Sequence, residues 1–412
     1  MMHVTGYRCT HCKREYAYSE DMLTCGHCGD LGILDILFDY TAIKKEFTRE
    51  TLASDRTNSI WRYRALLPVE GHNWERFLRV GWTPLYRSHA LERSLGLKAL
   101  YIKDDGLNPT ASLKDRASAV AVSRARELGY KTIACSSTGN AASSLAGNAS
   151  RMGLKSVIFV PERAPKGKVA QLLIFGANVI SVQGNYRQTF ELSAAAIEKW
   201  GFYNRNAGIN PIMAEGKKTA ALEIAEQLCF NPTDWVAVSV GDGCTIGGIY
   251  NGFNDLYKLG LLERIPKLLG VQSSGCAPFV KAASNDGKLE PAEENTLADS
   301  IAVGVPRNVE KALRAVRESF GAWVKVSDEA ILSAMRTLGS TEGVFGEPAG
   351  VAATAGVVKA LSKGLIKQNE SVTVLCTGSG LKDVSNAMAA AGEPFSCPPD
   401  LHALEKSGRI GT

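Results

Sequence analysis

The sequence predicts an α/β protein, with mainly parallel sheets covered by helices and a small zinc ribbon at the N-terminal end. Two observations carry this prediction. From about Gly81 onward, short β-branched runs alternate with longer amphipathic stretches rich in Ala and Leu, which is typical of consecutive βαβ units. Before Asp35 the chain instead has little apolar material and holds two Cys-x-x-Cys pairs.

The N-terminal segment, residues 1–37, is interpreted as a zinc ribbon. Two Cys-x-x-Cys pairs with twelve residues between them suit four thiolates around a tetrahedral zinc ion, and such a segment gains its folding free energy from the metal. The expected ligands are Cys9, Cys12, Cys25 and Cys28. A disulfide pair in an oxidising compartment and a ribbon without metal remain alternatives. Four protein ligands leave no open coordination position, so we expect a structural role.

After a polar arm from Phe38 to about Asn73, which could dock through Trp61, Tyr63 and Leu66-Leu67, the regular alternation begins. The predicted strands are Leu100–Lys103, Thr132–Ser136, Ser156–Val160, Asn178–Val182, Trp235–Val240, Leu268–Gln272, Trp323–Val326 and Val372–Cys376. The predicted helices are Leu113–Leu128, Asn140–Met152, Lys168–Phe175, Arg187–Lys199, Lys217–Cys229, Asp328–Leu338, Ala349–Leu361 and Lys382–Ala391.

Composition narrows the classes of function. No stretch approaches about 20 uninterrupted apolar residues, so we expect no membrane association and a cytoplasmic protein. The net charge of +5 is spread along the 412 residues without a long block of one sign, which argues against a nucleic-acid partner. The weak excess of positive charge fits a small anionic substrate equally well. The sequence leaves a homodimer open.

Ligands of open α/β sheets bind where strands lead into helices. The first polar turn of this kind is Asn108-Pro-Thr-Ala-Ser-Leu-Lys-Asp-Arg116, with Lys114 in the first turn of a helix. A lysine at the positive end of a helix dipole loses its proton more readily, which a Schiff-base lysine requires. By position alone, a solvated helix lysine is the competing interpretation.

Three further turns have a similar character. Cys135-Ser-Ser-Thr-Gly-Asn-Ala-Ala-Ser143 is rich in hydroxyl and amide groups and could also be a simple N-cap cluster. Ser239-Val-Gly-Asp-Gly-Cys-Thr-Ile-Gly-Gly248 has glycines that let backbone N–H groups surround a phosphate. Cys376-Thr-Gly-Ser-Gly-Leu-Lys-Asp383 ends the last strand with a hydroxyl group, which can bond a heterocycle nitrogen without adding charge.

In this order, from about Gly81 to Ala391, the turns resemble those of the fold type II enzymes that depend on pyridoxal phosphate (PLP), and within them the threonine synthase family. Asn210-Pro-Ile-Met-Ala-Glu-Gly-Lys-Lys-Thr219 and Gly343-Val-Phe-Gly-Glu-Pro-Ala-Gly350 also match the family, part of which has a similar zinc-ribbon extension. The resemblance implies two lobes: 38–111 with 212–412 as the large PLP-binding lobe, and 112–211 as a small mobile lobe.

The resemblance also implies the site residues. Lys114 would hold PLP as a Schiff base, Asn140 would bond its 3'-oxygen and Thr377 would face its pyridine nitrogen. The cofactor phosphate would lie on the loop Gly241, Asp242, Gly243, Cys244 and Thr245. The residues expected to receive the substrate's carboxylate and nearby groups are Thr83, Ser137 and Thr138. Those expected to contact a substrate phosphate are Arg205, Asn206, Lys217 and Lys218, and for each of these four a solvated basic turn remains an alternative.

Asp242 and Cys244 depart from the family pattern, which usually has Asn and Gly there. Because a carboxylate would repel a phosphate, we expect Asp242 to face away and the backbone amides to bind. The implied reaction converts O-phospho-L-homoserine and water to L-threonine and phosphate, a lyase reaction of threonine biosynthesis. The alternatives are a threonine or serine dehydratase, a cysteate- or cysteine-synthase type of β-replacement enzyme, and a binding module on an inactive scaffold.

Overall fold

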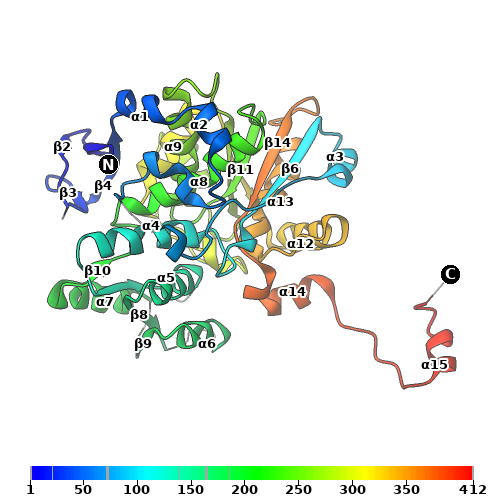
Figure 1. The fold of residues 1–412 in the computed structure, drawn as a ribbon. Helices are drawn as coiled ribbons and strands as arrows, with labels where there is room; N and C mark the ends of the chain where they lie inside the picture. The colour runs from blue at the N-terminus through cyan, green and yellow to red at the C-terminus, as the bar shows by residue number, and fades with distance from the viewer. Residues whose placement is uncertain are drawn as a thin grey trace.

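The computed structural model describes residues 2–410 except 21, 71–73, 138, 163–165 and 185, and only the backbone of residues 30, 166, 167, 186 and 187. Beyond the N-terminal segment, its strands form two sheets (Figure 1). The six-stranded sheet has the order β13(Ala322–Val326), β12(Lys267–Ser273), β11(Trp235–Ser239), β14(Ser371–Cys376), β6(Ala99–Asp104), β5(Leu85–Arg87). The four-stranded sheet has the order β10(Tyr203–Asn204), β7(Thr132–Ser136), β8(Lys155–Pro161), β9(Asn178–Val182). All neighbours in both sheets are parallel except β5 and β6.

The predicted strands are all present, each within about one residue of its expected ends. Helices occupy the predicted positions, and beyond β6 the structure adds α9, α10, α11 and α15, which were not predicted. The helices after β6 are α4(Lys114–Glu127), α5(Asn140–Arg151), α6(Lys166–Ile174), α7(Tyr186–Trp200), α8(Ile212–Gln227), α9(Cys244–Lys258), α10(Pro278–Ala283), α11(Val309–Glu318), α12(Asp328–Glu342), α13(Pro348–Ser362), α14(Val384–Ala391) and α15(Leu401–Lys406). Short 3₁₀ turns are η3(Asp105–Leu107), η4(Asp299–Ile301) and η5(Gly380–Lys382).

Helix α8 starts five residues before its predicted start at Lys217, and Gly216 lies inside it. This glycine lets α8 approach α4 closely, because a Cβ at position 216 would lie 2.4 Å from the carbonyl oxygen of Arg116. The predicted helix from Lys382 begins instead at Val384, after the 3₁₀ turn η5.

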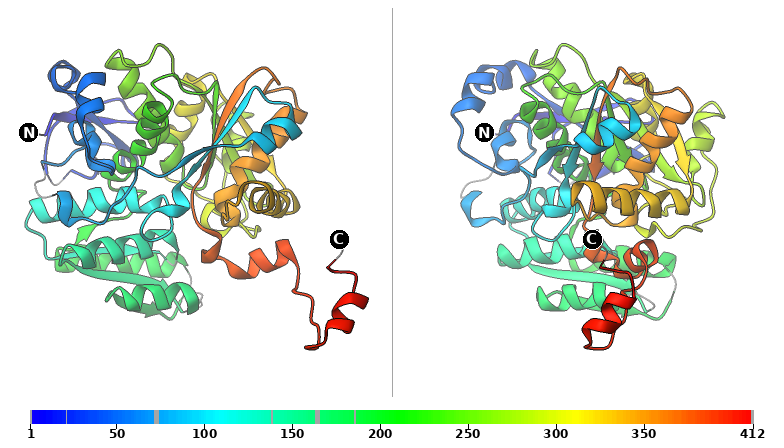
Figure 2. Two further views of the ribbon diagram at one scale, coloured as in Figure 1. Left: turned by 45° about the vertical axis from the view of Figure 1, so that its right-hand side comes forward. Right: turned by 90° about the vertical axis from the view of Figure 1, so that its right-hand side faces the viewer.

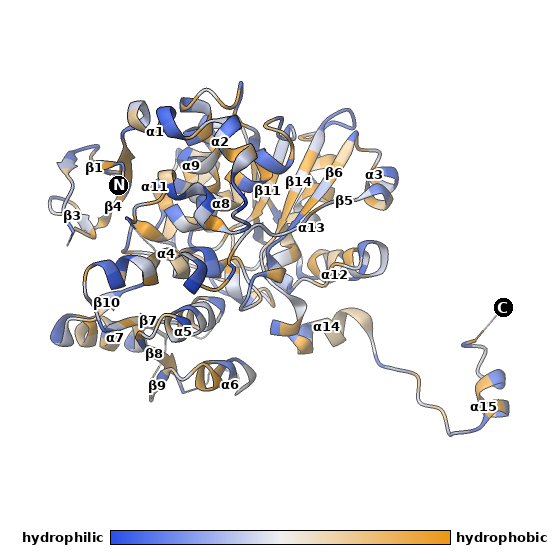
Figure 3. Ribbon diagram, in the orientation of Figure 1, coloured by the Kyte–Doolittle hydropathy of each residue, from blue (hydrophilic) through white to orange (hydrophobic). Residues whose placement is uncertain are grey.

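The central strands of the six-stranded sheet are buried on both faces, as in parallel sheets that carry helices on either side. Alternate residues of β11 belong to different apolar cores: Val236 and Val238 to one, Trp235 and Ala237 to the other. Helices α9 and α11 pack on the first face and α13 on the second. In Figure 3 the strands of this sheet stand out as apolar between more polar helices.

The four-stranded sheet and its helices form a second layered unit. Helices α5 and α7 contact β8, and α6 contacts β9. Figure 2 shows this unit, in teal to green, at one end of the molecule beside the larger sheet. Helix α4 contacts both α5 and α8, so the element that begins with Lys114 lies where the two units meet.

The N-terminal segment forms a separate antiparallel sheet, in the order β2(Glu15–Ala17), β1(Val4–Cys9), β4(Gly29–Phe38), β3(Thr24–Cys25). The polar arm follows as α1(Tyr40–Glu46), α2(Arg49–Ser54), η1(Ile60–Leu66) and η2(Trp74–Arg76), and α3(His89–Leu95) precedes β6. The apolar anchors predicted for this arm, Trp61, Tyr63 and Leu66-Leu67, are buried. The Tyr63 hydroxyl donates to Glu226 of α8 over 2.7 Å. The arm therefore docks on the main body.

The C-terminal end differs from the rest. After α14 the chain extends away from the body to α15 (Figure 1). Among the described helices, none combines the length and the apolar run needed to cross a membrane.

Candidate active site

Lys114 is the first residue of α4, and its turn is held against the turn that contains Thr377. Ser112 and Gly378 form an antiparallel bridge, and the backbone N–H of Leu113 donates to the carbonyl oxygen of Thr377 over 2.9 Å. Thr377 directly follows β14, so both turns lie at the edge of the sheet where its parallel strands end.

One cavity lies at this edge of the sheet. It is lined by residues of both sheet units, and most of the predicted cofactor residues are among them. The lining includes Lys114, Ala141, Arg205, Ala207, Lys217, Ser239, Gly241, Asp242, Gly243, Cys244, Thr245, Ser300, Glu347 and Thr377.

The cavity changes the acidity of Lys114. Burial lowers the pKa of Lys114 to about 8; the positive charges of Lys217 and Arg205 act in the same direction, while Glu347 opposes them. A neutral amine is the form that attacks a carbonyl carbon or accepts a proton. Near neutral pH, this lysine therefore offers far more of that form than a solvated one does.

The loop Gly241–Thr245 leads from β11 into α9, and Gly243 is the N-cap residue of α9 with a φ of 91°. A side chain is excluded there, because a Cβ would lie 2.8 Å from the carbonyl oxygen of Asn308 and 2.9 Å from the Cβ of Ala312. As a glycine, Gly243 has no side chain with which to cap α9. Gly243, Cys244 and Thr245 line the cavity, so the first N–H groups of α9 offer an anion site there.

The carboxylate of Asp242 is bound on the side of the 307–308 segment. It accepts hydrogen bonds from the backbone N–H of Arg307 over 2.8 Å and from Asn308 Nδ2 over 2.6 Å. Both oxygens thus have donors outside the loop, and the backbone amides of the loop are left for an anion.

Asn140 is the first residue of α5 and is buried. Its Nδ2 donates to Glu347 Oε1 over 2.6 Å, and Glu347 lines the cavity. Burial, with Asp299, raises the pKa of Glu347 to about 7 against the opposing charges of Lys114 and Lys168. Our sequence interpretation assigned no role to Glu347, although its position within Gly343–Gly350 was a signal.

A wider, more open cavity adjoins the first one. Arg205 and Asp242 line both cavities, and Ser137 and Asn206 line the wider one. Arg205 is buried and donates to Ser118 Oγ, and burial lowers its pKa.

Asn206 accepts from the backbone N–H of Ser136 over 3.1 Å. Its Nδ2 is buried and makes no hydrogen bond within the described part of the chain, so a donor is available for a ligand.

Two predicted substrate residues lie elsewhere. Thr83 donates to Asp105 over 2.7 Å and belongs to a fully buried ionic network beneath α4. Lys218 lies 2.5 Å from Glu215 and 2.7 Å from Asp255, on the side of α8 that faces the N-terminal segment. Neighbouring helix residues point about 100° apart, so only Lys217 of the pair reaches the cavity. Thr138 lies outside the described residues.

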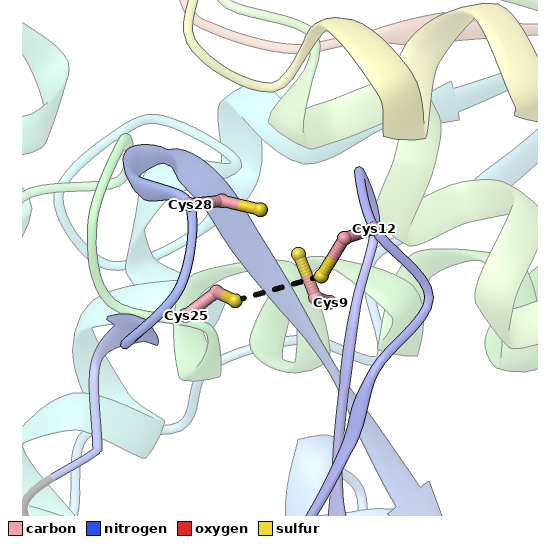
Figure 4. Close-up of side chains that lie close together, drawn as sticks. All are labelled: Cys9, Cys12, Cys25 and Cys28. Atoms are coloured by element: carbon pink, nitrogen blue, oxygen red, sulfur yellow. Dashed lines mark hydrogen bonds between the residues drawn. The ribbon is translucent and has the colours of Figure 1, made fainter.

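The four cysteines of the N-terminal segment converge, as Figure 4 shows. Their sulfur atoms all lie within 4.8 Å of one another, and the sulfurs of Cys12 and Cys25 are 3.8 Å apart. Four sulfurs at about 2.3 Å from a tetrahedral zinc ion would lie about 3.8 Å apart. The arrangement therefore fits zinc.

Comparisons with known proteins agree with this geometry. Residues 77–378 match the family model described as pyridoxal-phosphate dependent enzyme. Threonine synthase of Methanocaldococcus jannaschii is 39% identical, with 97% of this chain and 98% of that protein covered. Threonine synthase of Methanosarcina acetivorans is 38% identical with the same coverage, and that of Synechocystis is 37% identical over 84% of this chain and 89% of that protein.

Solved structures show the same fold. Threonine deaminase isoform 2 of Solanum lycopersicum superposes with a TM-score of 0.66 at 23% identity, over 76% of this chain and 88% of that one. Diaminopropionate ammonia lyase of Escherichia coli has a TM-score of 0.66 at 19% identity, over 77% and 89%. The fold, the lysine cavity and the relatives that match almost the whole chain agree: this chain belongs to the threonine synthase group of the fold type II PLP-dependent enzymes.

Proposed function

We propose that this chain converts O-phospho-L-homoserine and water to L-threonine and phosphate. The observation that carries the proposal is the shared cavity of Lys114, Thr377 and the start of α9, in a chain with relatives named threonine synthase that match almost its whole length.

The cavity suits PLP. The N–H groups at the start of α9 and the glycine backbone of Gly241–Thr245 would hold its phosphate. The Thr377 hydroxyl makes no hydrogen bond among the described residues and would face the pyridine nitrogen. When bound, PLP draws electrons from the amino acid's α carbon.

Lys114 would carry the cofactor and then, as a free amine, accept and return protons at the α and β carbons. Its lowered pKa supports both tasks, since the amine must alternate between charged and neutral forms near neutral pH.

The substrate phosphate would lie in the wider cavity, next to Arg205 and the free Nδ2 of Asn206, with Lys217 behind them. Ser137 and Thr138 would receive the carboxylate. Thr83 and Lys218 would support the frame through their buried partners.

We further propose that residues 112–211 close over the substrate and exclude water until it is needed, while 38–111 and 212–412 hold the cofactor. The ribbon, residues 1–37, would bind one structural zinc ion through Cys9, Cys12, Cys25 and Cys28. Thiolate ligands suit a reducing cytoplasm. The proposed partner is a small phosphorylated amino acid, and the assembly a homodimer.

The deciding assay compares phosphate release from O-phosphohomoserine with keto-acid release from threonine or serine. We expect phosphate and threonine in equal amounts, and neither from Lys114→Ala. Keto acid alone would instead identify a dehydratase. A protein that takes up no PLP and stays colourless would refute the enzyme assignment.

A further inference from the structure

Glu347 occupies a buried position between two groups assigned to the cofactor. It is the N-cap residue of α13, and its backbone N–H donates to the carbonyl oxygen of Gly378 over 2.9 Å. The residue is only 3% exposed and lines the cavity with Lys114 and Thr377. A carboxyl group buried at such a cost in solvation needs partners that hold it there.

The side-chain hydrogen bond of Glu347 in the described residues is with Asn140, from Nδ2 to Oε1 over 2.6 Å. The contact lies against the backbone of Gly378: a Cβ there would lie 2.4 Å from Glu347 Oε1 and 3.3 Å from Asn140 Nδ2. The absence of a side chain at Gly378 therefore leaves the space in which Glu347 and Asn140 meet.

The surrounding charges come from four elements: Lys114 of α4, Lys168 of α6, Asp299 of η4 and Lys382 of η5. Lys168 is paired with Asp299. Lys382 donates to Ser143 Oγ over 2.9 Å and to Gln171 Oε1 over 2.7 Å. Neither of these lysines is hydrogen-bonded to Glu347, so its close polar contact is the amide of Asn140.

This contact fixes which end of the amide faces which way. Glu347 accepts from the nitrogen of Asn140, so Oδ1 of the amide points away from the carboxyl group. Ionisation of Glu347 strengthens this orientation, because an ionised carboxylate only accepts hydrogen bonds. Nδ2 has two N–H groups and gives one to Glu347. The second N–H, and Oδ1, make no hydrogen bond within the described part of the chain. A flipped amide would present an oxygen to the carboxylate and lose the bond.

We propose that Glu347 is a positioning residue, which holds the Asn140 amide so that its second N–H is donated to the 3'-oxygen of PLP. That oxygen is an acceptor, and an amide oxygen turned toward it would repel it. The inference rests on the proposed cofactor role of Asn140. It assigns Glu347 an effect on PLP binding that operates only through Asn140.

The test is a double-mutant cycle on PLP affinity, measured by equilibrium dialysis of the full chain. Glu347→Ala should weaken PLP binding about tenfold, the effect of losing one charge-assisted hydrogen bond. Glu347→Ala in an Asn140→Ala background should change the affinity less than about twofold, because its partner is already absent. Glu329→Gln, at an exposed glutamate of α12, is the control and should leave the affinity unchanged.

Glu347→Gln separates this role from a merely structural one. Its amide oxygen can still accept from Asn140, so PLP affinity should stay within about threefold of the wild type. The loss of negative charge beside the cofactor should nevertheless lower the midpoint of the pH titration of the visible absorption band. Circular dichroism of each variant shows whether it is folded, and Glu347→Gln keeps the test available if the alanine variant is not.

A tenfold loss from Glu347→Ala that persists in the Asn140→Ala background would overturn the inference, and so would an unchanged affinity in the single variant. A wild-type protein that binds PLP and obeys the cycle, but forms no threonine, would refute the proposed function and leave this inference standing.

Discussion

Replacing Arg116 by Met should lower the free energy of unfolding far more than a substitution at an exposed position does. Arg116 lies two residues after Lys114 and is fully buried. Its guanidinium is bonded to both oxygens of Asp105, at 2.6 and 2.8 Å, and to both oxygens of Glu223, at 2.5 and 2.8 Å. Lys103 completes the network, 2.7 Å from Glu223.

The magnitude follows from the charges. The network holds two cations and two anions with no net charge, and all four side chains in it are fully buried. Arg116→Met leaves one buried negative charge without a partner, which costs about 3–5 kcal/mol. Although burial acts to raise the pKa of Glu223, Arg116 and Lys103 lower it to about 2, which shows how strongly the carboxylate depends on them.

The assay is urea unfolding at pH 7, with Arg126→Met as a matched control, since Arg126 is exposed on the same helix. We expect the control to change the free energy of unfolding by less than about 0.5 kcal/mol. Adding Glu223→Gln to Arg116→Met should recover part of the loss, because the unpaired charge is removed. A loss below about 1 kcal/mol for Arg116→Met would refute the reasoning.

Three further predictions concern the site and the ribbon. The rate of PLP uptake, followed by growth of the visible band, should rise as pH increases through about 8, since Lys114 reacts as the neutral amine. Lys217→Met should move that midpoint upward because a neighbouring positive charge is removed; an unchanged midpoint would contradict this. Asn206→Ala should raise the KM for O-phosphohomoserine about tenfold and leave PLP affinity unaltered. An equal loss of PLP affinity would show that Asn206 binds the cofactor phosphate instead of the substrate phosphate. Metal analysis should find one zinc ion per chain in the wild type and less than about half an equivalent in Cys9→Ser; wild type with less than half an equivalent would count against the ribbon.

Much of the fold was predictable because its signals are local. Buried parallel strands such as Trp235–Ser239 are short apolar runs, and helices such as Asp328–Glu342 bury residues that are three or four apart, so both are visible in short windows. The paired cysteines were equally visible, because metal coordination imposes their spacing.

Other parts depended on contacts between distant segments. Gly216 favours the end of a helix locally, yet it lies inside α8 because α4 needs the space of its missing Cβ. Lys217 and Lys218 are indistinguishable by sequence, and only the rotation of α8 directs one to the cavity and the other to Glu215 and Asp255.

By itself, then, the sequence determined the α/β class, the order of the four polar turns and the resemblance that gives Lys114 its role. Tertiary structure alone decided that Thr83 is bound to Asp105 and that Glu347 is bound to Asn140 inside the cavity. The physical reason is that periodicity and spacing act over a few residues, whereas the direction of a buried polar group is set by whichever distant partner satisfies its hydrogen bond.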